Sequence, residues 1–289
     1  MIRIITDSAS DMDITWAQKH HISVLPMQIQ CGEHTYQDRY ELDADAFYNM
    51  LTQSATLPST SQITPYTFEE EFLKVHAAGD EALVIVMSGA LSGTYASACL
   101  AAAAYDEIHV VDSCNVTVGE HCLLSLAIRL RAEGKSVIQI KEILEDRKQH
   151  IRVLALLDTL EYLKKGGRIP ATTALAGTLL SIKPVVSVKD GAVEVIGKAR
   201  GSKNGNNLLV ELVKKSGGID FTLPLYLGYT GCNRALLDQY IADSHLLWKS
   251  HITADALQIL QIGSTIGTHV GPGAIAIAFF SADNKLFTR

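Results

Sequence analysis

The sequence lacks several features that would place it in a specialised class of protein. Its five cysteines are odd in number and widely spaced, and no two form a C-x-x-C pair, so neither a disulfide framework nor a zinc site is indicated. No apolar run approaches the roughly 18 residues of a membrane-spanning helix. Basic residues do not dominate, because 25 Lys and Arg stand against 31 Asp and Glu, which does not favour binding to nucleic acid.

Well-known catalytic motifs are also missing. No Gly-x-x-x-x-Gly-Lys-Ser/Thr loop is present, and no Gly-x-Gly-x-x-Gly opens a helix, so a Walker-type NTPase or a Rossmann dehydrogenase is unsupported. Gly-x-Ser-x-Gly and His-Glu-x-x-His are absent as well. The remaining polar candidates are hydroxyls, one histidine and scattered basic groups. Side chains of these types can hold a carboxylate or a phosphate.

The chain that remains is typical of a globular protein. It has 289 residues, 47% of them hydrophobic and 19% charged, enough for one large or two ordinary domains. A strand-like pattern begins at residue 2, which leaves no room for a signal peptide. Together with the unpaired cysteines, this predicts a reduced, cytoplasmic protein.

The first half alternates buried strands with helices. The predicted strands lie at residues 2–6, 82–87, 109–112 and 151–157, and the predicted helices at residues 67–78, 96–104, 117–133 and from Ser136 to about Arg147. This alternation predicts a parallel sheet covered on both faces. Pro26 divides residues 22–30 into two short edge-type strands, and Asp43 is expected to cap a helix that continues to residue 53.

The pattern changes after residue 158. We expect a short helix at 160–169, a small-residue helix at 172–180, a hairpin of residues 185–189 and 192–198 around Asp190-Gly191, helices at 206–215 and 233–244, and strands at 223–229 and 274–280. The fold class is therefore α/β with two domains. Residues 1–158 form an N-terminal parallel-sheet domain, and residues 159–289 form a C-terminal α+β domain.

Three polar segments are candidates for a site. Residues 88–95 (Ser-Gly-Ala-Leu-Ser-Gly-Thr-Tyr) join a buried strand to a helix, a geometry that offers backbone N–H groups to an anion. Residues 58–65 form a linker rich in hydroxyls. A strand-like stretch at 259–266 leads into a loop at 266–274, where His269 precedes a Gly-Pro-Gly turn. Each segment has a plainer interpretation as a turn, a cap or a loop with an incidental histidine.

Charge is distributed unevenly along the chain. Residues 161–203 contain eight Lys or Arg and three Asp or Glu, a local charge of +5, which leaves −11 for the rest of a chain of net charge −6. Such a basic segment favours contact with an anionic ligand or an acidic partner, although a solvated surface is the alternative.

Several segments in this order and spacing resemble the DegV family. They are residues 6–11 (Thr-Asp-Ser-Ala-Ser-Asp), 60–62 (Thr-Ser-Gln), 88–95, 157–169 and 268–274. The resemblance spans nearly the whole chain. It implies a two-domain protein that holds one long-chain fatty acid in a tunnel between its domains. It also implies a non-catalytic subunit that presents the carboxylate to a separate ATP-binding fatty acid kinase subunit, which forms the acyl-phosphate for phospholipid metabolism.

The resemblance also assigns residues to roles. Carboxylate-binding roles fall on Thr60, Ser61, Ser92, Gly93 and His269, and positions at the pocket mouth or the kinase-docking face fall on Arg168 and Arg200. It implies no metal and no cofactor besides the bound fatty acid. We expect no nucleic-acid partner, no membrane span and at most transient contact with a membrane surface. The alternatives are an enzyme, a phosphotransferase or acyl hydrolase that uses Ser61 or Ser92 with His269, and a regulatory lipid sensor with the same pocket.

Overall fold

The first sheet has the parallel arrangement that the sequence predicts. The structure, a computed structural model, describes residues 1–54, 56–173 and 181–283. The strands of the first sheet are β1 (Ile2–Asp7), β2 (Ile22–Leu25), β6 (Glu81–Val86) and β7 (Ile108–Asp112). They lie in the order β2-β1-β6-β7, and every neighbouring pair is parallel.

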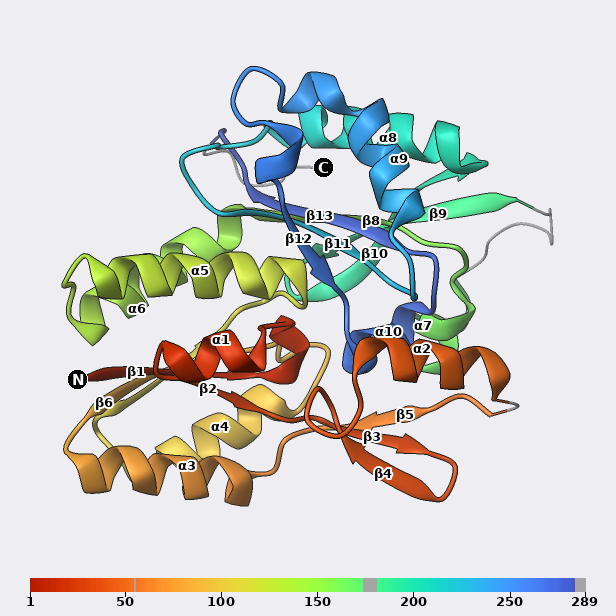
Figure 1. The fold of residues 1–289 in the computed structure, drawn as a ribbon. Helices are drawn as coiled ribbons and strands as arrows, with labels where there is room; N and C mark the ends of the chain where they lie inside the picture. The colour runs from red at the N-terminus through yellow and green to blue at the C-terminus, as the bar shows by residue number, and fades with distance from the viewer. Residues whose placement is uncertain (55, 174–180, 284–289) are drawn as a thin grey trace.

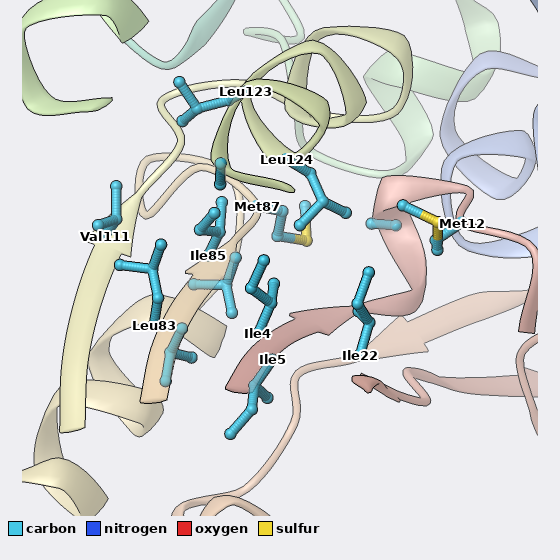
Figure 2. Packing of buried hydrophobic residues seen from close by; sticks show 14 of the residues in the cluster. Ile4, Ile5, Met12, Ile22, Leu83, Ile85, Met87, Val111, Leu123 and Leu124 are labelled. Atoms are coloured by element: carbon cyan, nitrogen blue, oxygen red, sulfur yellow. The ribbon is translucent and has the colours of Figure 1, made fainter. Parts of the chain in front are cut away.

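Helices cover both faces of this sheet (Figure 1). The helices of this part are α1 (Ile14–Lys19), α3 (Pro65–Ala78), α4 (Thr94–Ala102), α5 (Val118–Ala132) and α6 (Val137–Arg147). Helices α3 and α4 lie on one face, and α5 and α6 lie on the other. Figure 2 shows Ile4 and Ile85 on the face toward Leu124 of α5, and all three side chains are fully buried. Burial on both faces explains why these strands are continuous apolar runs.

The second sheet is mixed. Its strands are β8 (Ile151–Leu156), β9 (Ile182–Lys189), β10 (Ala192–Arg200), β11 (Leu225–Tyr229), β12 (Gln258–Gln261) and β13 (Ile275–Phe280). Their order is β10-β9-β8-β13-β11-β12, with β11 and β12 parallel and the other neighbours antiparallel. Helices α8 (Ser202–Lys215) and α9 (Ala235–Asp243) cover its outer face, and α5 lies between the two sheets (Figure 1).

The placement of β8 corrects one expectation. The strand at 151–157 was predicted to continue the parallel sheet, but β8 pairs antiparallel with β13 and β9 in the second sheet. An apolar run that is buried on both faces has the same composition in either sheet, so periodicity cannot assign its neighbours. The domain boundary after residue 158 stays a prediction.

A third, small sheet joins the two parts. It has the order β4-β3-β5 and consists of β3 (Gln28–Cys31), β4 (His34–Gln37) and β5 (Ser59–Ser61). Helix α2 (Ala44–Gln53) lies beside it, and α10 (Ser264–Val270) contacts α2, β3, β5 and also α7 (Glu161–Lys165). A helix from the end of the chain therefore packs against elements from its beginning.

Two segments near the site form elements that the sequence did not predict. The hydroxyl-rich linker contains β5, which pairs antiparallel with β3. His269 lies in the last turn of α10 instead of a loop, and the preceding strand, β12, ends at Gln261. Gly and β-branched residues are poor helix formers, so α10 gave no helical signal and depends on its packing against α2 and α7.

The prediction for the two strands around Pro26 is half right. Pro26 separates β2 from β3, and β2 is an edge strand, but β3 is the central strand of the small sheet, so the prediction of a second edge strand is wrong. Other local predictions are confirmed. The Asp43 side chain caps α2, Ser136 forms a capping box on α6, and Asp190-Gly191 form the hairpin turn. Residues 174–180 of the predicted small-residue helix lie outside the described residues. In the described ranges, no helix is long and apolar enough to cross a membrane.

The remaining regular elements are short 3₁₀ helices: η1 (Ser8–Ser10), η2 (Lys148–His150), η3 (His245–Leu247) and η4 (Ala254–Ala256).

Candidate ligand-binding site

The site lies where the strand order of the first sheet changes direction. β2 flanks β1 on one side, and β6 and β7 follow on the other, so the carboxyl ends of β1 and β6 meet at this point. In open parallel sheets the ligand crevice forms outside the strand ends at such a switch point. The segment after β6 includes Met87, Leu91, Ser92 and Gly93, and all four line a cavity of about 370 Å³.

The cavity collects most of the predicted site residues. Its lining includes Thr60, Ser61, Ser92, Gly93, Arg168 and His269. Arg200 is exposed at the end of β10 and is not part of this lining. Segments that are distant in the sequence therefore converge at one cavity, and Arg200 stands apart from it.

Thr60 and His269 form the polar contact at this cavity. Thr60 Oγ1 lies 2.9 Å from His269 Nε2. Successive side chains of a strand point to opposite faces, so Thr60 is half-buried toward the cavity whereas its neighbour Ser61 is exposed. The contact to His269 is thus made by Thr60, and Ser61 contributes only to the wall.

Ser92 and Gly93 lie at the start of α4. The Ser92 hydroxyl is 2.9 Å from Thr94 Oγ1, and it accepts the backbone N–H of Thr94 at 3.3 Å. Gly93 is the N-cap residue of this nine-residue helix. A Cβ at Gly93 would lie 1.9 Å from Gln62 Oε1, so a larger residue there would displace the Gln62 side chain. The strand–turn–helix geometry that the sequence indicated is present beside the cavity.

The His269 imidazole is half-buried. Burial and, to a smaller extent, the positive charge of Arg168 together lower its pKa to about 4, so the ring is neutral at pH 7. Nδ1 is buried and has no hydrogen-bond partner among the described residues. A Cβ at Gly166 would lie 2.2 Å from Nδ1, so this side of the ring packs directly against α7's C-terminal turn. At neutral pH the ring can donate or accept one hydrogen bond through Nε2.

Arg168 connects α7 to the loop that carries Ser92. Its Nη1 donates to Gly166 O at 2.6 Å, and its Nε and Nη2 donate to Leu91 O at 3.3 and 3.2 Å. The guanidinium is partly buried, which lowers its pKa, and it lines the cavity. The arginine therefore places a positive charge beside the hydroxyls and the imidazole.

Two residues of the cavity lining, Gln62 and Thr265, have no role that the sequence predicted. Gln62 Nε2 donates to Ser97 Oγ at 3.0 Å, and Thr265 lies one helical turn before His269 on the same face of α10. Recognition of residues 264–270 as a helix would have grouped Thr265 with His269 by its i, i+4 spacing. The glycine and β-branched composition concealed that helix.

An apolar chamber continues from the cavity into the space between the second sheet, α10 and the segment Val116-Thr117 that precedes α5. It measures about 60 Å³ and shares Val116, Leu163, Val193, Ile266 and Val270 with the larger cavity. Its floor includes Ala155 and Ala276, which pair across β8 and β13. Small side chains at these paired positions leave room above the sheet. The combined space is polar at one end and apolar at the other.

Because the pKa of His269 is lowered in the folded protein, we expect the stability of the protein to depend on pH. Its pKa is about 4 in the folded protein and 6.5 in the unfolded chain, so unfolding takes up a proton between these pH values and stability falls as the pH drops from 6.5 toward 4. Compared with His269→Gln, ligand-free wild type should lose stability more steeply over this range, by up to about 1.4 kcal/mol per pH unit.

Urea unfolding at pH 7, 6 and 5 measures this difference. Comparison with His269→Gln isolates His269 from His121, another buried histidine whose pKa is lowered to about 4. Equal slopes of the free energy of unfolding against pH for the two proteins would contradict a lowered pKa of His269 in the folded state.

The fold and the site define an α/β protein of two main sheets and one small sheet, with a cavity that has one polar and one apolar end. A sequence profile of the family described as "Uncharacterised protein, DegV family" matches residues 1–282. The chain belongs to the DegV family.

Relatives from bacteria agree with this assignment. The chain is 35% identical to a DegV domain-containing protein of Lactococcus lactis, over 98% of each chain. It is 30% identical to one of Caldanaerobacter subterraneus, over 96% of this chain and 98% of the relative.

Solved structures with the same fold include proteins that bind fatty acids. A DegV family protein of Thermus thermophilus, described by its fatty acid binding, has a TM-score of 0.86 and 29% identity, with 97% of this chain and 99% of that chain covered. A fatty acid binding DegV protein of Bacillus subtilis has a TM-score of 0.79 and 27% identity, with 96% and 98% covered. A stearic acid-binding protein of Eubacterium ventriosum has a TM-score of 0.84 and 25% identity, with 96% and 97% covered.

Proposed function

We propose that this protein binds one long-chain fatty acid and presents its carboxylate to a separate ATP-binding kinase subunit, which forms the acyl-phosphate. The observation that carries the proposal is the single cavity whose polar end holds Thr60, Ser92 and His269 and whose other end is an apolar chamber. The fatty acids bound by similar solved structures support it.

The polar end suits a carboxylate. An unpaired buried carboxylate is strongly disfavoured, and hydrogen bonds to a charged group are stronger than neutral ones. The hydroxyls of Thr60 and Ser92 and the Nε2–H of His269 are candidate donors, with Ser61 and the backbone N–H of Gly93 at the same wall. Arg168 adds a positive charge beside them. A carboxylate can be held by these groups without a metal ion.

The apolar end suits an acyl chain. Burial of about 15 methylenes at roughly 0.8 kcal/mol each contributes on the order of 12 kcal/mol, part of which offsets the loss of ligand freedom on binding. The chamber walls that would receive the chain include Val153, Val186 and Ile262 together with the alanine pair of β8 and β13. A long chain therefore supplies most of the affinity, and the head group fixes its direction.

Phosphorylation requires a partner because the sequence has no recognisable nucleotide-binding loop. We place the docking surface for that partner near Arg168 at the cavity and Arg200 on the exposed end of β10. The excess of basic residues at 161–203 supports an acidic partner surface. Since the kinase subunit uses ATP, we propose that the exchange occurs in the cytoplasm.

The geometry around His269 favours a binding role over hydrolysis by the isolated chain. A hydrolytic triad needs an acid that orients the histidine through its second nitrogen. In the described part of the chain, Nδ1 of His269 has no such partner and packs against Gly166. A regulatory lipid sensor would use the same pocket and would differ in its partner.

Lipid extraction tests the proposed ligand. Protein purified from a bacterial host should release close to one fatty acid of about 16 to 18 carbons per chain, because burial of that many methylenes makes dissociation slow. Mass spectrometry of the extract identifies the acid. The matched control is the double variant Ser92→Ala/His269→Ala, which should retain its fold by circular dichroism and carry much less lipid.

The proposal fails if the wild-type protein is free of lipid and also shows no binding when the delipidated protein is titrated with palmitate or oleate.

A further inference from the structure

A buried polar cluster lies behind the cavity and joins the N-terminal part of the chain to α10. It consists of Asp11, Asp38 and Arg39, which we call the α10 clamp. Arg39 Nη2 donates to Asp11 Oδ1 at 2.5 Å and to the backbone oxygen of Gln261 at 2.9 Å. The Asp11 side chain is 1% exposed and that of Arg39 is 19% exposed, so the pair is largely removed from water. None of the three clamp residues lines the cavity.

The two acidic members of the clamp contact the start of α10. Asp11 Oδ1 accepts the backbone N–H of Gly263 at 2.9 Å, and Asp38 Oδ2 accepts the Thr265 hydroxyl at 2.6 Å. Gly263 permits this approach, because a Cβ there would lie 2.8 Å from Arg39 Nη2. The clamp thus forms hydrogen bonds to the chain immediately before α10 and to the first turn of that helix.

Tyr48 of α2 makes a further contact with the segment at the start of α10. Its hydroxyl donates to Ile262 O at 2.9 Å, and a Cβ at Gly267 would lie 2.6 Å from that hydroxyl. Helix α10 therefore has little freedom to slide or to rotate about its axis. Since Thr265 and His269 are separated by one turn, any rotation that moves Thr265 also moves His269.

Stability alone does not explain a buried cluster of charged groups. Desolvation of buried charges opposes their mutual attraction, and well-packed apolar residues often stabilise a protein equally well. Asp38 is fully buried, and its Oδ1 has no hydrogen-bond partner among the residues that the structure describes. Buried polar groups can fix one geometry among several, which here is the geometry of α10.

We propose that the α10 clamp positions His269 against Thr60, so that Asp11, Asp38 and Arg39 are positioning residues for carboxylate binding. This inference rests on the proposed function for its effect on the ligand. The effect of the clamp on His269 itself is independent of which ligand the cavity accepts. The proposed function and the positioning role of the clamp can therefore fail separately.

The test compares Asp38→Ala with Asp38→Asn in ligand-free protein. Alanine removes the acceptor for the Thr265 hydroxyl, whereas asparagine keeps an amide oxygen at the same place. The readout is the His269 imidazole in ¹H–¹⁵N NMR spectra, assigned by its loss in His269→Gln. We expect its titration midpoint to move toward 6.5 in Asp38→Ala and to stay near the wild-type value in Asp38→Asn.

Affinity provides a second readout. We expect Asp38→Ala to weaken palmitate binding about tenfold and to add little when His269 is already alanine, because residues that act through one another are not additive. The matched control is Asp45→Ala. Asp45 accepts the side-chain amide of Gln261 at 2.7 Å from an exposed position outside the clamp, and its loss should leave the His269 titration unchanged.

The proposal is overturned if Asp38→Ala lowers thermal stability but leaves the His269 titration and palmitate affinity unchanged, or if its effect is fully additive with His269→Ala. If Asp38→Ala does not fold, Thr265→Val removes the same hydrogen bond from the other side. Because Thr265 also lines the cavity, the His269 titration alone decides for this variant, and an unchanged titration overturns the proposal. If wild-type protein binds no palmitate, the proposed function fails, and the NMR comparison still decides the role of the clamp.

Discussion

Replacement of His269 by alanine is expected to weaken the binding of a long-chain fatty acid by about 10- to 100-fold. The loss corresponds to one hydrogen bond to a charged group, worth about 1.5 to 3 kcal/mol. Thr60 also loses its partner at 2.9 Å, so a second donor becomes less well oriented. Isothermal titration of delipidated protein with palmitate measures the change.

His34→Ala is the control for this variant, because His34 is exposed on β4 and is not part of the cavity lining. It should bind palmitate like the wild type. Thermal melts should show that His269→Ala remains folded at the temperature of the titration. Wild-type affinity in a folded His269→Ala protein would remove His269 from the carboxylate site.

Ala276→Leu is expected to shift the preference of the protein toward shorter fatty acids. Ala276 lies opposite Ala155 on one side and Gly228 on the other, and the two alanines line the chamber. A leucine that excludes about three methylenes of the ligand removes about 2.4 kcal/mol of burial, or about 60-fold in affinity for palmitate. Decanoate, which does not need that part of the chamber, should bind with little change.

Titration of each variant with decanoate and palmitate measures this shift. Ala192→Leu adds the same side chain at an exposed position of β10 and should leave the ratio of the two affinities unchanged. Equal losses for both fatty acids in Ala276→Leu would instead indicate general damage to the protein. An unchanged palmitate affinity would place the acyl chain elsewhere.

The parallel sheet and its helices could be predicted because their signals are local. Residues such as Ile4, Leu83 and Ile85 belong to short apolar runs that are bounded by caps and turns, and those runs became β1 and β6. Caps at Asp43 and Ser136 depend only on the next three residues. The order of the strands and the membership of β8 depend on contacts that are distant in sequence, which local patterns do not encode.

Motifs alone indicated separate polar segments, and the resemblance to the DegV family assigned Thr60, Ser61, Ser92, Gly93 and His269 to one carboxylate site. The structure brings these residues to one cavity. The choice of Thr60 as the residue that contacts His269, and the position of Arg200 outside the lining, became visible only in the fold. The alternation of side chains along a strand makes Thr60, and not Ser61, the contact of His269. That choice could not be predicted because β5 was not predicted.

The sequence by itself determined most helices and strands, the excess of basic residues at 161–203 and the chemical groups available for a ligand. These properties depend on composition and on neighbours within one or two turns of chain. The tertiary structure alone decided that α10 is a helix, that Asp38 and Thr265 meet across 227 positions, and that the pKa of His269 is lowered to about 4. Each of these depends on how segments distant in sequence pack together and on which groups that packing removes from water. This is a property of the packed molecule and not of any one segment.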